Sequence, residues 1–378
     1  MQQRGGWTNR RDCTMIVDEA DEETMGQNDE NGKPGAGLTY RDAGVDIDAQ
    51  DEALRRIKDL VRGTRTAGVL SDLGGFGGMF APRLDGMAQP VLVSSADGVG
   101  TKLRIAFLTG IHNTVGRDLV QHCINDILVQ GARPMFFMDY VATGRLDPRV
   151  LTAVVEGIAT ACKDQGCALL GGETAEMPGF YGDDEYDVAG FIVGLVDREK
   201  ILDGGRVRVG DRLIGLPSSG LHTNGYSLAR KIFFELAGLD VKDRVDDLSA
   251  TVGETLLAEH LCYLNPLALA LDEGWLHALA HITGGGLTDN LPRVLPEGTA
   301  AKIHPGSWPV LPVFEYMQRV GDVANDEMFR TFNMGIGMVA ICDPEAGDLL
   351  ESHLDRIGQP HYRIGEVVAG DGRVHYAG

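Results

Sequence analysis

The chain has 378 residues, a formal net charge of −21 and a hydrophobic fraction of 43%, so it is long enough for two domains with a sizeable core. The negative charge disfavours nonspecific binding to nucleic acid or to an anionic membrane. Glycine, with 51 residues, is about twice as frequent as its usual share of roughly 7%, which indicates many loops where the backbone turns sharply or approaches a ligand.

The first half of the chain alternates between helical and strand-like patterns. An acidic, polar stretch over residues 1–37 has little to bury and predicts a disordered tail. Apolar positions at helical spacing then predict a helix over residues 48–64. Helices are also expected over 114–132 and 148–166, and strands over 91–95, 134–144, the start of 167–179, and 186–197. This order is typical of an α/β fold.

The alternation restarts after about residue 205. A strand and loop are expected over residues 211–220, a helix over 224–238 and a pair of strands near the C-terminus. The chain therefore divides into a tail (1–37), an N-terminal domain (38–205) and a C-terminal α/β domain (206–378).

The segment DGVGTK follows the predicted strand over residues 91–95 and contains Asp97, Gly98, Gly100, Thr101 and Lys102. A carboxylate, a flexible backbone, a hydroxyl and an ammonium at a strand exit suit a bound phosphate with its metal ion. The segment is not a Walker A motif, which requires GxxxxGK[ST]. A plain turn into a helix, with a solvated lysine, is the alternative.

A second glycine-rich segment, LGGFGG, contains Gly74, Gly75, Phe76 and Gly77. Such a loop can fold over a ligand and offer main-chain N–H donors. A mobile loop without a ligand has the same composition.

Three acidic residues lie at places where ligands gather in α/β proteins. Asp97 follows a strand, Asp126 lies next to Asn125 inside an amphipathic helix, and Glu173 follows a strand and a glycine pair. Mg²⁺ prefers hard oxygen ligands, commonly one or two carboxylates with phosphate and water. Together these residues predict a magnesium site, although an arginine could pair with a buried Asp126 equally well.

The second half carries two polar, glycine-bearing loops. Ser218, Ser219, His222 and Asn224 precede a predicted helix, where a phosphate or an ordinary helix cap would fit. His222 could act as a general acid or base or orient a substrate. Gly284, Gly285 and Gly286 form the second loop and could contact substrate through the main chain.

The six cysteines (Cys13, Cys123, Cys162, Cys167, Cys262 and Cys342) form no CxxC pair, so their spacing does not predict a zinc site. Reduced thiols in a cytoplasmic protein are the simple interpretation. No apolar run approaches the ~18 residues of a membrane span, and the N-terminal region has no apolar core of a secretory signal.

The motif Asp126-x₄-Gly131-Ala132-x-Pro134 resembles the DxxxxGAxP element of the aminoimidazole ribonucleotide (AIR) synthetase superfamily. The resemblance is strongest to its phosphoribosylformylglycinamidine cyclo-ligase family. It is carried, in the family's order over about residues 39–370, by YRDAGVDIDA, LGGFGG, DGVGTKLR, GGETAEMPG, YDVAGF, SSGLHTNGYSLARKI, TGGGLTDNLPRVLP and RTFNMGIGM.

This resemblance implies ATP-dependent closure of formylglycinamidine ribonucleotide to 5-aminoimidazole ribonucleotide, with ADP and phosphate released. It implies Mg²⁺ as cofactor, and a homodimer whose N-terminal domains form a shared β-barrel with ATP nearby. Lys102 and Lys58 become candidate phosphate contacts, with His222 as a third catalytic candidate. Asn125 joins the two glycine-rich segments as an ATP contact; for Lys58 an exposed helix lysine is the alternative.

Two other kinds of function compete with this one. A sister enzyme such as selenophosphate synthetase would need a reactive Cys or selenocysteine near the N-terminal glycine region, where only Cys13 in the tail is available. The amidotransferase-linked synthetase shares the fold but matches the quoted motifs less closely. A protein that binds ATP without turnover is expected to lack the acidic residues or Lys102, and all of them are present.

Overall fold

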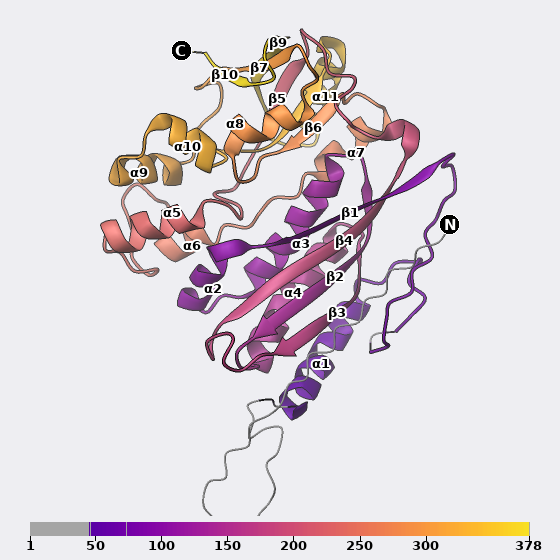
Figure 1. The fold of residues 1–378 in the computed structure, drawn as a ribbon, viewed down its shortest axis with the longest axis vertical. Coiled ribbons are helices and arrows are strands. Elements are labelled where there is room, and N and C mark those ends of the chain that lie inside the picture. Colours follow the sequence, from indigo (N-terminus) through magenta and orange to yellow (C-terminus); the bar gives the residue numbers. More distant parts are fainter. Residues whose placement is uncertain (1–44, 46, 73, 378) are drawn as a thin grey trace, which may run out of the picture. The chain divides into compact units, whose positions relative to one another are not determined.

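The computed structural model describes residues 45, 47–72 and 74–377. The predicted tail over residues 1–37 lies outside the described residues. The first half contains a four-stranded sheet in the order β1-β4-β2-β3 (Figure 1). Its strands are β1 (Pro90–Gly98), β2 (Arg133–Thr143), β3 (Ala168–Glu176) and β4 (Tyr186–Asp197). The β2–β3 pair is parallel, whereas β4 runs antiparallel to both β1 and β2.

Helices α3 (Asn113–Leu128) and α4 (Pro148–Asp164) pack against each other and against this sheet. Asp147 caps α4 by accepting a hydrogen bond from the Arg149 backbone, and Pro148 occupies the first turn. The helices approach so closely that a Cβ at Gly157 would lie 1.9 Å from the Asn113 carbonyl oxygen. Helix α1 (Ile47–Arg62) packs on α4, and the short α2 (Leu103–Thr109) follows β1.

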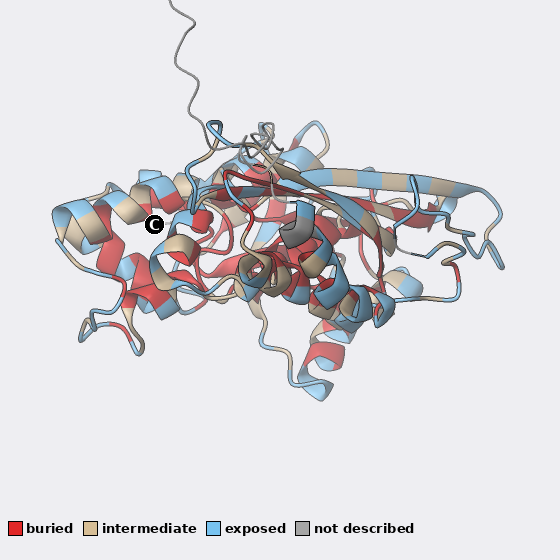
Figure 2. Cartoon of the chain, turned by 90° about the horizontal axis from the view of Figure 1, so that it is seen from below, coloured by how far each residue is buried: buried red, intermediate tan, exposed pale blue. Residues whose placement is uncertain are grey.

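The other face of the first sheet is largely apolar and exposed. Leu92, Phe191 and Met138 are 65%, 43% and 37% exposed. Met138 pairs with Phe191, and Leu92 pairs with Leu195, four residues further along β4. Because alternate residues of a strand point to opposite faces, all three lie on one side. Figure 2 shows the helices on the opposite side of these strands, with buried residues concentrated between the two layers.

The second half contains a six-stranded sheet in the order β10-β7-β9-β5-β8-β6. Its strands are β5 (Arg212–Pro217), β6 (Ala278–His281), β7 (Thr299–Ile303), β8 (Ile336–Cys342), β9 (Tyr362–Ala369) and β10 (Val374–Tyr376). Its helices are α5 (Tyr226–Arg230), which continues as a π-helical turn over Lys231–Leu236, α6 (Val252–Leu256), α7 (Leu264–Asp272), α8 (Gly286–Asn290), α9 (Pro312–Gly321), α10 (Asn325–Thr331) and α11 (Pro344–Arg356). The mixed α/β composition expected from the sequence is confirmed.

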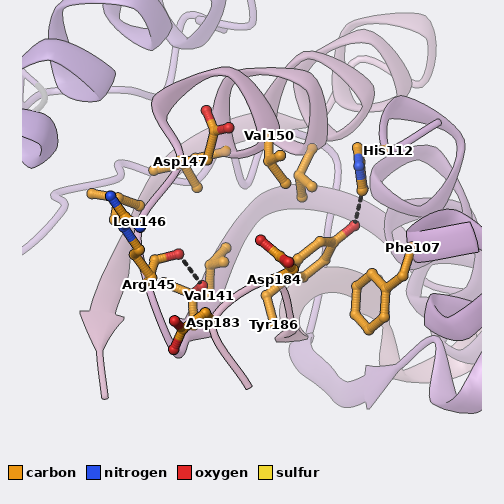
Figure 3. Close-up of a pocket in the computed structure, with 13 residues that line it drawn as sticks. Phe107, His112, Val141, Arg145, Leu146, Asp147, Val150, Asp183, Asp184 and Tyr186 are labelled. Carbon is orange, nitrogen blue, oxygen red and sulfur yellow. Dashed lines mark hydrogen bonds between the residues drawn. The ribbon is translucent and has the colours of Figure 1, made fainter. Parts of the chain in front are cut away.

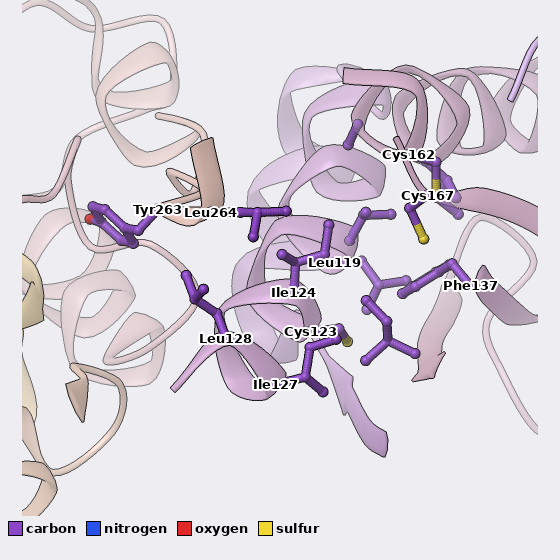
Figure 4. Close-up of a cluster of buried hydrophobic side chains, with 14 of the residues drawn as sticks. Leu119, Cys123, Ile124, Ile127, Leu128, Phe137, Cys162, Cys167, Tyr263 and Leu264 are labelled. Atoms are coloured by element: carbon purple, nitrogen blue, oxygen red, sulfur yellow. The ribbon is translucent and has the colours of Figure 1, made fainter. Parts of the chain in front are cut away.

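One hydrophobic core extends from the first half into the second. Figure 4 shows Tyr263 and Leu264 beside the α3 residues Ile124 and Leu128, and both groups belong to the same buried cluster. Helix α3 contacts the first sheet and also α7 and β6. It therefore positions side chains at the junction between the halves. Among the described helices, none is both long enough and apolar enough to span a membrane.

Candidate functional site

A cavity of about 590 Å³ lies where α3 and β1 meet the second half. The first half contributes Ser95, Asp97, His122 and Asp126 to its lining, and the second half contributes His281, Thr283, Asn290 and Arg293. Arg293 is the one lysine or arginine among the described residues that line it. The cavity thus places carboxylates, imidazoles and a single guanidinium around one space.

Two carboxylates predicted to bind metal are brought together here. The Oδ2 atom of Asp97 lies 2.8 Å from His122 Nε2, and the same nitrogen lies 3.6 Å from Asp126 Oδ2. Asp126 also accepts hydrogen bonds from Ser95 Oγ at 3.0 Å and from His281 Nδ1 at 2.9 Å. Ligand atoms of Asp97, His122 and Asp126 all lie within 4.8 Å of one another, so these side chains could share one cation.

The histidines hold these carboxylates in the ionised form. Burial alone would raise the pKa of Asp97, but its hydrogen bond with His122 lowers that pKa below the ordinary value. Asp126 behaves alike: burial opposes ionisation, and the hydrogen bond from His281 lowers its pKa. For His122, burial favours the neutral ring, but its bond to Asp97 and the charge of Asp126 raise its pKa.

Two further histidines complete a buried cluster. His222 stacks on His260 with ring centroids 4.0 Å apart. His260 Nε2 lies 3.1 Å from His281 Nε2, and Thr223 Oγ1 lies 2.8 Å from His122 Nδ1. Burial lowers the pKa of His222 and of His260 well below the ordinary value and also lowers that of His281. These three rings are therefore neutral at neutral pH.

Buried polar side chains of the first half fix the backbone segment 258–263 of the second half. Lys102 Nζ donates to the Ala258 carbonyl at 2.7 Å, and Asp118 accepts from the His260 backbone N–H at 2.6 Å. Asn125 donates to the Leu261 carbonyl at 2.8 Å and accepts from the Tyr263 backbone N–H at 3.0 Å. The segment that carries His260 is thus held in place by three side chains of the first half.

This arrangement does not support the predictions for Lys102 and Asn125. Lys102 is fully buried and forms an ion pair with Asp118 at 2.6 Å, so its ammonium is directed into the protein rather than toward a phosphate. Burial lowers the pKa of Lys102 and raises that of Asp118, and their mutual attraction opposes both shifts. Asn125 is fully buried too, and its amide is committed to backbone partners instead of a nucleotide.

Glu173 does not join Asp97 and Asp126 within one chain. It lies inside β3, which continues to Glu176, and not after the strand as expected. Strands β1 and β3 form opposite edges of the sheet, about 14 Å apart for three strand spacings. Glu173 pairs with Tyr140 and so lies on the uncovered face, whereas Asp97 pairs with Gly190 on the helix-covered face.

The two glycine-rich segments have different surroundings. Gly74, Gly75, Phe76 and Gly77 are exposed, and the Phe76 side chain is fully open to solvent. Gly100 and Thr101 instead lie beside the second half: the Thr101 hydroxyl is 3.4 Å from Ser227 Oγ, and a Cβ at Gly100 would lie 3.8 Å from the Thr223 carbonyl oxygen. Gly98 ends β1 and pairs with Ala189 of β4. Gly100 has φ +54°, a conformation that favours glycine.

The loops predicted to bind substrate lie close together. A Cβ at Gly284 would be 3.2 Å from Asn224 Oδ1, so the loop with Gly284, Gly285 and Gly286 faces the one with His222 and Asn224. Ser218 donates to Asn333 and Ser219 to the Glu259 carbonyl. His222 is buried with φ +61°, and its Nε2 accepts from the Ser219 backbone at 3.3 Å. These bonds give Ser218, Ser219 and His222 structural roles in shaping the loop.

Lys58 is exposed on α1, which packs on α4 and β3. No described side chain joins it to the cavity at Asp97.

A second, smaller cavity of about 230 Å³ lies beside Phe107, His112 and Tyr186, and Figure 3 shows the hydrogen bond between His112 and the Tyr186 hydroxyl. None of the residues predicted for catalysis, ATP, metal or substrate lines this second cavity.

Four residues that line or complete the site were not predicted from the sequence: His122, His260, His281 and Arg293. One signal was available for His122: it precedes Asp126 by four residues on a predicted helix, so both lie on one face. His281 precedes the loop with the three glycines by only a few residues, which also placed it near a candidate site. No local pattern identifies His260.

The comparisons with known proteins agree with the resemblance seen in the sequence. Residues 83–196 match the family "AIR synthase related protein, N-terminal domain", and residues 208–377 match its C-terminal domain. A protein of Citrifermentans bemidjiense called phosphoribosylformylglycinamidine cyclo-ligase is 51% identical over 334 residues, which cover 88% of this chain and 96% of the relative.

Solved structures with low sequence identity share the fold. Thiamine-monophosphate kinase from Stenotrophomonas maltophilia has a TM-score of 0.62 at 19% identity, covering 85% of this chain and 96% of that one. The hydrogenase maturation protein HypE, solved in complex with ATP, has a TM-score of 0.58 at 20% identity, covering 85% and 90%. With both family domains matched and 51% of the aligned residues identical to a relative that is covered over 96% of its length, the chain belongs to the AIR synthase related family.

Proposed function

We propose that this chain catalyses ATP-dependent ring closure of formylglycinamidine ribonucleotide to 5-aminoimidazole ribonucleotide, with release of ADP and phosphate, a step of purine biosynthesis. The relatives that are 51% identical to it over the aligned residues are called phosphoribosylformylglycinamidine cyclo-ligase. The observation that carries the proposal is the cavity at the junction of the halves, which contains both Asp97 and Asp126.

The reaction needs a good leaving group where the substrate has a poor one. Phosphorylation of the amide oxygen by ATP supplies that leaving group, and an amidine nitrogen of the same molecule then attacks the carbon and closes the ring. Most of the catalysis is positioning of reactants and neutralisation of phosphate charge. A cavity that combines carboxylates for a cation with a guanidinium suits both tasks.

Asp97 and Asp126 fit a magnesium ion that accompanies ATP. Their oxygens are the hard donors that Mg²⁺ prefers, and their lowered pKa values keep them ionised at neutral pH. Bound there, Mg²⁺ would neutralise charge on the nucleotide phosphates. His122 and His281 orient the carboxylates through the hydrogen bonds described above, and Arg293 offers a cation to phosphate from the second half of the chain.

The remaining site assignments are part of the same proposal. Gly98, Gly100 and Thr101 approach the nucleotide, and the exposed loop with Gly74, Gly75, Phe76 and Gly77 closes over it. The facing loops with Asn224 and with Gly284, Gly285 and Gly286 hold the ribonucleotide through main-chain and amide groups. His222, a neutral and buried ring, acts as a positioning residue for these loops rather than as a proton donor.

We also propose a homodimer formed through the uncovered face of the first sheet. Leu92, Met138 and Phe191 form an apolar surface on a sheet whose edge strands, among those described, are β1 and β3. Joining two such sheets would bury this surface and pair the edges in a barrel. Glu173 lies on that face and belongs to the dimer contact in this proposal. A cytoplasmic location follows from the cysteine pattern of the sequence and from the proposed pathway.

The experiment is a coupled assay of ADP release with and without formylglycinamidine ribonucleotide. Wild-type protein should release ADP only with substrate present, and Asp126→Asn should lose at least a hundredfold in rate, on the order of what one electrostatic contact contributes, because one hard oxygen ligand is replaced. Asp326→Asn, which changes an exposed acid on α10, is the matched control and should behave as wild type. Substrate-independent ADP release, or full activity in Asp126→Asn, would contradict the proposal.

A further inference from the structure

Three buried histidine rings form a nearly equilateral triangle next to the proposed ATP site. The ring centroids of His122, His260 and His281 are 5.2, 5.0 and 5.1 Å apart, with interplanar angles of 57°, 68° and 71°. One nitrogen from each ring lies within 4.8 Å of the nitrogens of the other two. The three residues come from α3, from segment 258–263 and from β6, so the fold as a whole creates the triangle.

The dimensions match those of a tetrahedral ion bound by three imidazoles. With a Zn–N distance of about 2.05 Å and about 1.15 Å from nitrogen to ring centre, each centroid lies about 3.2 Å from the ion, so tetrahedral geometry separates the centroids by about 5.2 Å. The observed separations of 5.0 to 5.2 Å agree with this value. The nitrogens of His260 and His281, 3.1 Å apart, are also close to the ~3.3 Å expected between two such ligands.

Hydrogen bonds place the lone pair of two of the rings on Nε2. His281 donates Nδ1–H to Asp126, so in the neutral ring Nε2 carries the lone pair. The amide of Asn125 is oriented by the Leu261 carbonyl and the Tyr263 N–H, and it directs an N–H at His260 Nε2, 3.1 Å away. The lone pair of His260 therefore also lies on Nε2, 3.1 Å from Nε2 of His281, and an ion bound there would replace the hydrogen bond from Asn125.

The surroundings supply what a metal site requires beyond its ligands. A ligating histidine commonly donates its other N–H to a carboxylate, as His281 does to Asp126, and such partners fix the ring orientation. The backbone of His260 is held by Asp118. His122 lies 2.8 Å from Asp97 through Nε2 and 2.8 Å from Thr223 through Nδ1, and an ion bound by this ring would replace one of these two contacts and require the ring in its neutral form. His122 and His281 also line the 590 Å³ cavity, which gives an ion a route from solvent.

We propose that His122, His260 and His281 bind one zinc-class divalent ion (Zn²⁺, Co²⁺ or Ni²⁺) per chain. Three imidazole nitrogens favour these borderline metals, whereas Mg²⁺ prefers the oxygens of Asp97 and Asp126. The site is thus separate in chemistry from the magnesium site although it adjoins it. It does not depend on the proposed reaction, and the cysteine spacing, which predicted no zinc site, has no bearing on it.

The test is a titration of chelator-treated, tag-free protein with Co²⁺, followed by visible absorption. The wild-type chain should take up one Co²⁺ with the intense absorption of a tetrahedral, nitrogen-ligated ion. Zn²⁺ should abolish this absorption, and excess Mg²⁺ should leave it in place. His260→Gln and His122→Gln should each weaken binding by at least about tenfold, whereas His375→Gln, an exposed histidine of β10, should bind as wild type does.

Three results would overturn the proposal. One is a folded wild-type chain that gives no tetrahedral Co²⁺ spectrum, which is decisive whether or not the variants fold. Another is an unchanged affinity in His260→Gln and His122→Gln, provided that circular dichroism shows both to be folded. Displacement of Co²⁺ by Mg²⁺ would equally contradict it, because the site would then be the oxygen site at Asp97 and Asp126.

Discussion

Replacing Lys102 with methionine separates a structural role for this residue from a role in binding phosphate. Lys102 and Asp118 are both fully buried and lie 2.6 Å apart. Methionine fills much of the same volume, so the main effect is a buried Asp118 carboxylate without its cation. Removal of one partner from a buried ion pair costs about 3–5 kcal/mol, which is a large part of the roughly 5–15 kcal/mol that stabilises a typical domain.

The double variant Lys102→Met/Asp118→Asn tests the cause of this loss. The amide introduced at position 118 would be neutral but would still accept the hydrogen bond from the His260 backbone, which Asp118 accepts at 2.6 Å. The Ala258 carbonyl would lose its bond from Lys102, at a cost of about 1–3 kcal/mol, but no uncompensated charge would remain. The double variant should therefore be more stable than Lys102→Met alone in urea denaturation at fixed protein concentration.

The loss in Lys102→Met should grow with pH. Burial already raises the pKa of Asp118, and removal of Lys102 raises it further above its unfolded value. The folded state then binds more protons than the unfolded state, so stability is greatest at low pH and falls as pH rises through the folded pKa. The difference from wild type should accordingly be larger at about pH 8 than at about pH 5.

A different result would restore the role predicted from the sequence. If Lys102 contacts phosphate, Lys102→Met should keep wild-type stability while the KM for ATP rises steeply. That combination would refute the structural interpretation. A stability loss that is the same in the single and double variants would show that the Asp118 charge is not its cause.

Three further changes test other parts of the structure. Asp97→Asn should weaken binding of Mg-ATP by at least about tenfold in calorimetry without loss of stability, because Asp97 is about half exposed; unchanged binding would remove Asp97 from the metal site. Phe191→Asp should convert a dimer into a monomer in light scattering, since Phe191 is 43% exposed on the uncovered sheet face; a dimer that persists would place the interface elsewhere. Asn125→Ala should lower the free energy of unfolding by about 2–4 kcal/mol, because it leaves the Leu261 carbonyl and the Tyr263 N–H unpaired. A loss below about 1 kcal/mol would contradict this.

Local sequence signals predicted several elements well because local chemistry determines their ends. Helix α4 begins at Pro148 behind its Asp147 cap and ends just before Gly166, close to the predicted span of 148–166. Strand β4 covers the predicted residues 186–197. The meeting of Asp97 and Asp126 was also expected, and it occurs because α3 packs along β1 and turns Asp126 toward the end of that strand.

The expectations that differ from the structure concern residues whose partners are distant in the sequence. Lys102 is followed by its ion-pair partner 16 positions later (from 102 to 118), but the carbonyl that it bonds belongs to Ala258, and no local pattern contains that contact. The expected position of Glu173 after the strand was wrong because β3 continues beyond the glycine pair, so a pleated strand and not a loop determines the sheet face on which Glu173 lies. The histidine triangle joins three elements separated by up to 159 residues (from 122 to 281), and only the tertiary fold brings them together.

The most direct measurement of the proposed reaction follows the amide oxygen of the substrate. The purified protein would be incubated with Mg-ATP and formylglycinamidine ribonucleotide labelled with ¹⁸O in its formyl group, and the products would be analysed by mass spectrometry. If the amide oxygen is phosphorylated before ring closure, the label should appear in inorganic phosphate, with 5-aminoimidazole ribonucleotide and ADP formed in equal amounts. Ring closure with the label in water, or ATP binding without a new nucleotide product, would contradict the account.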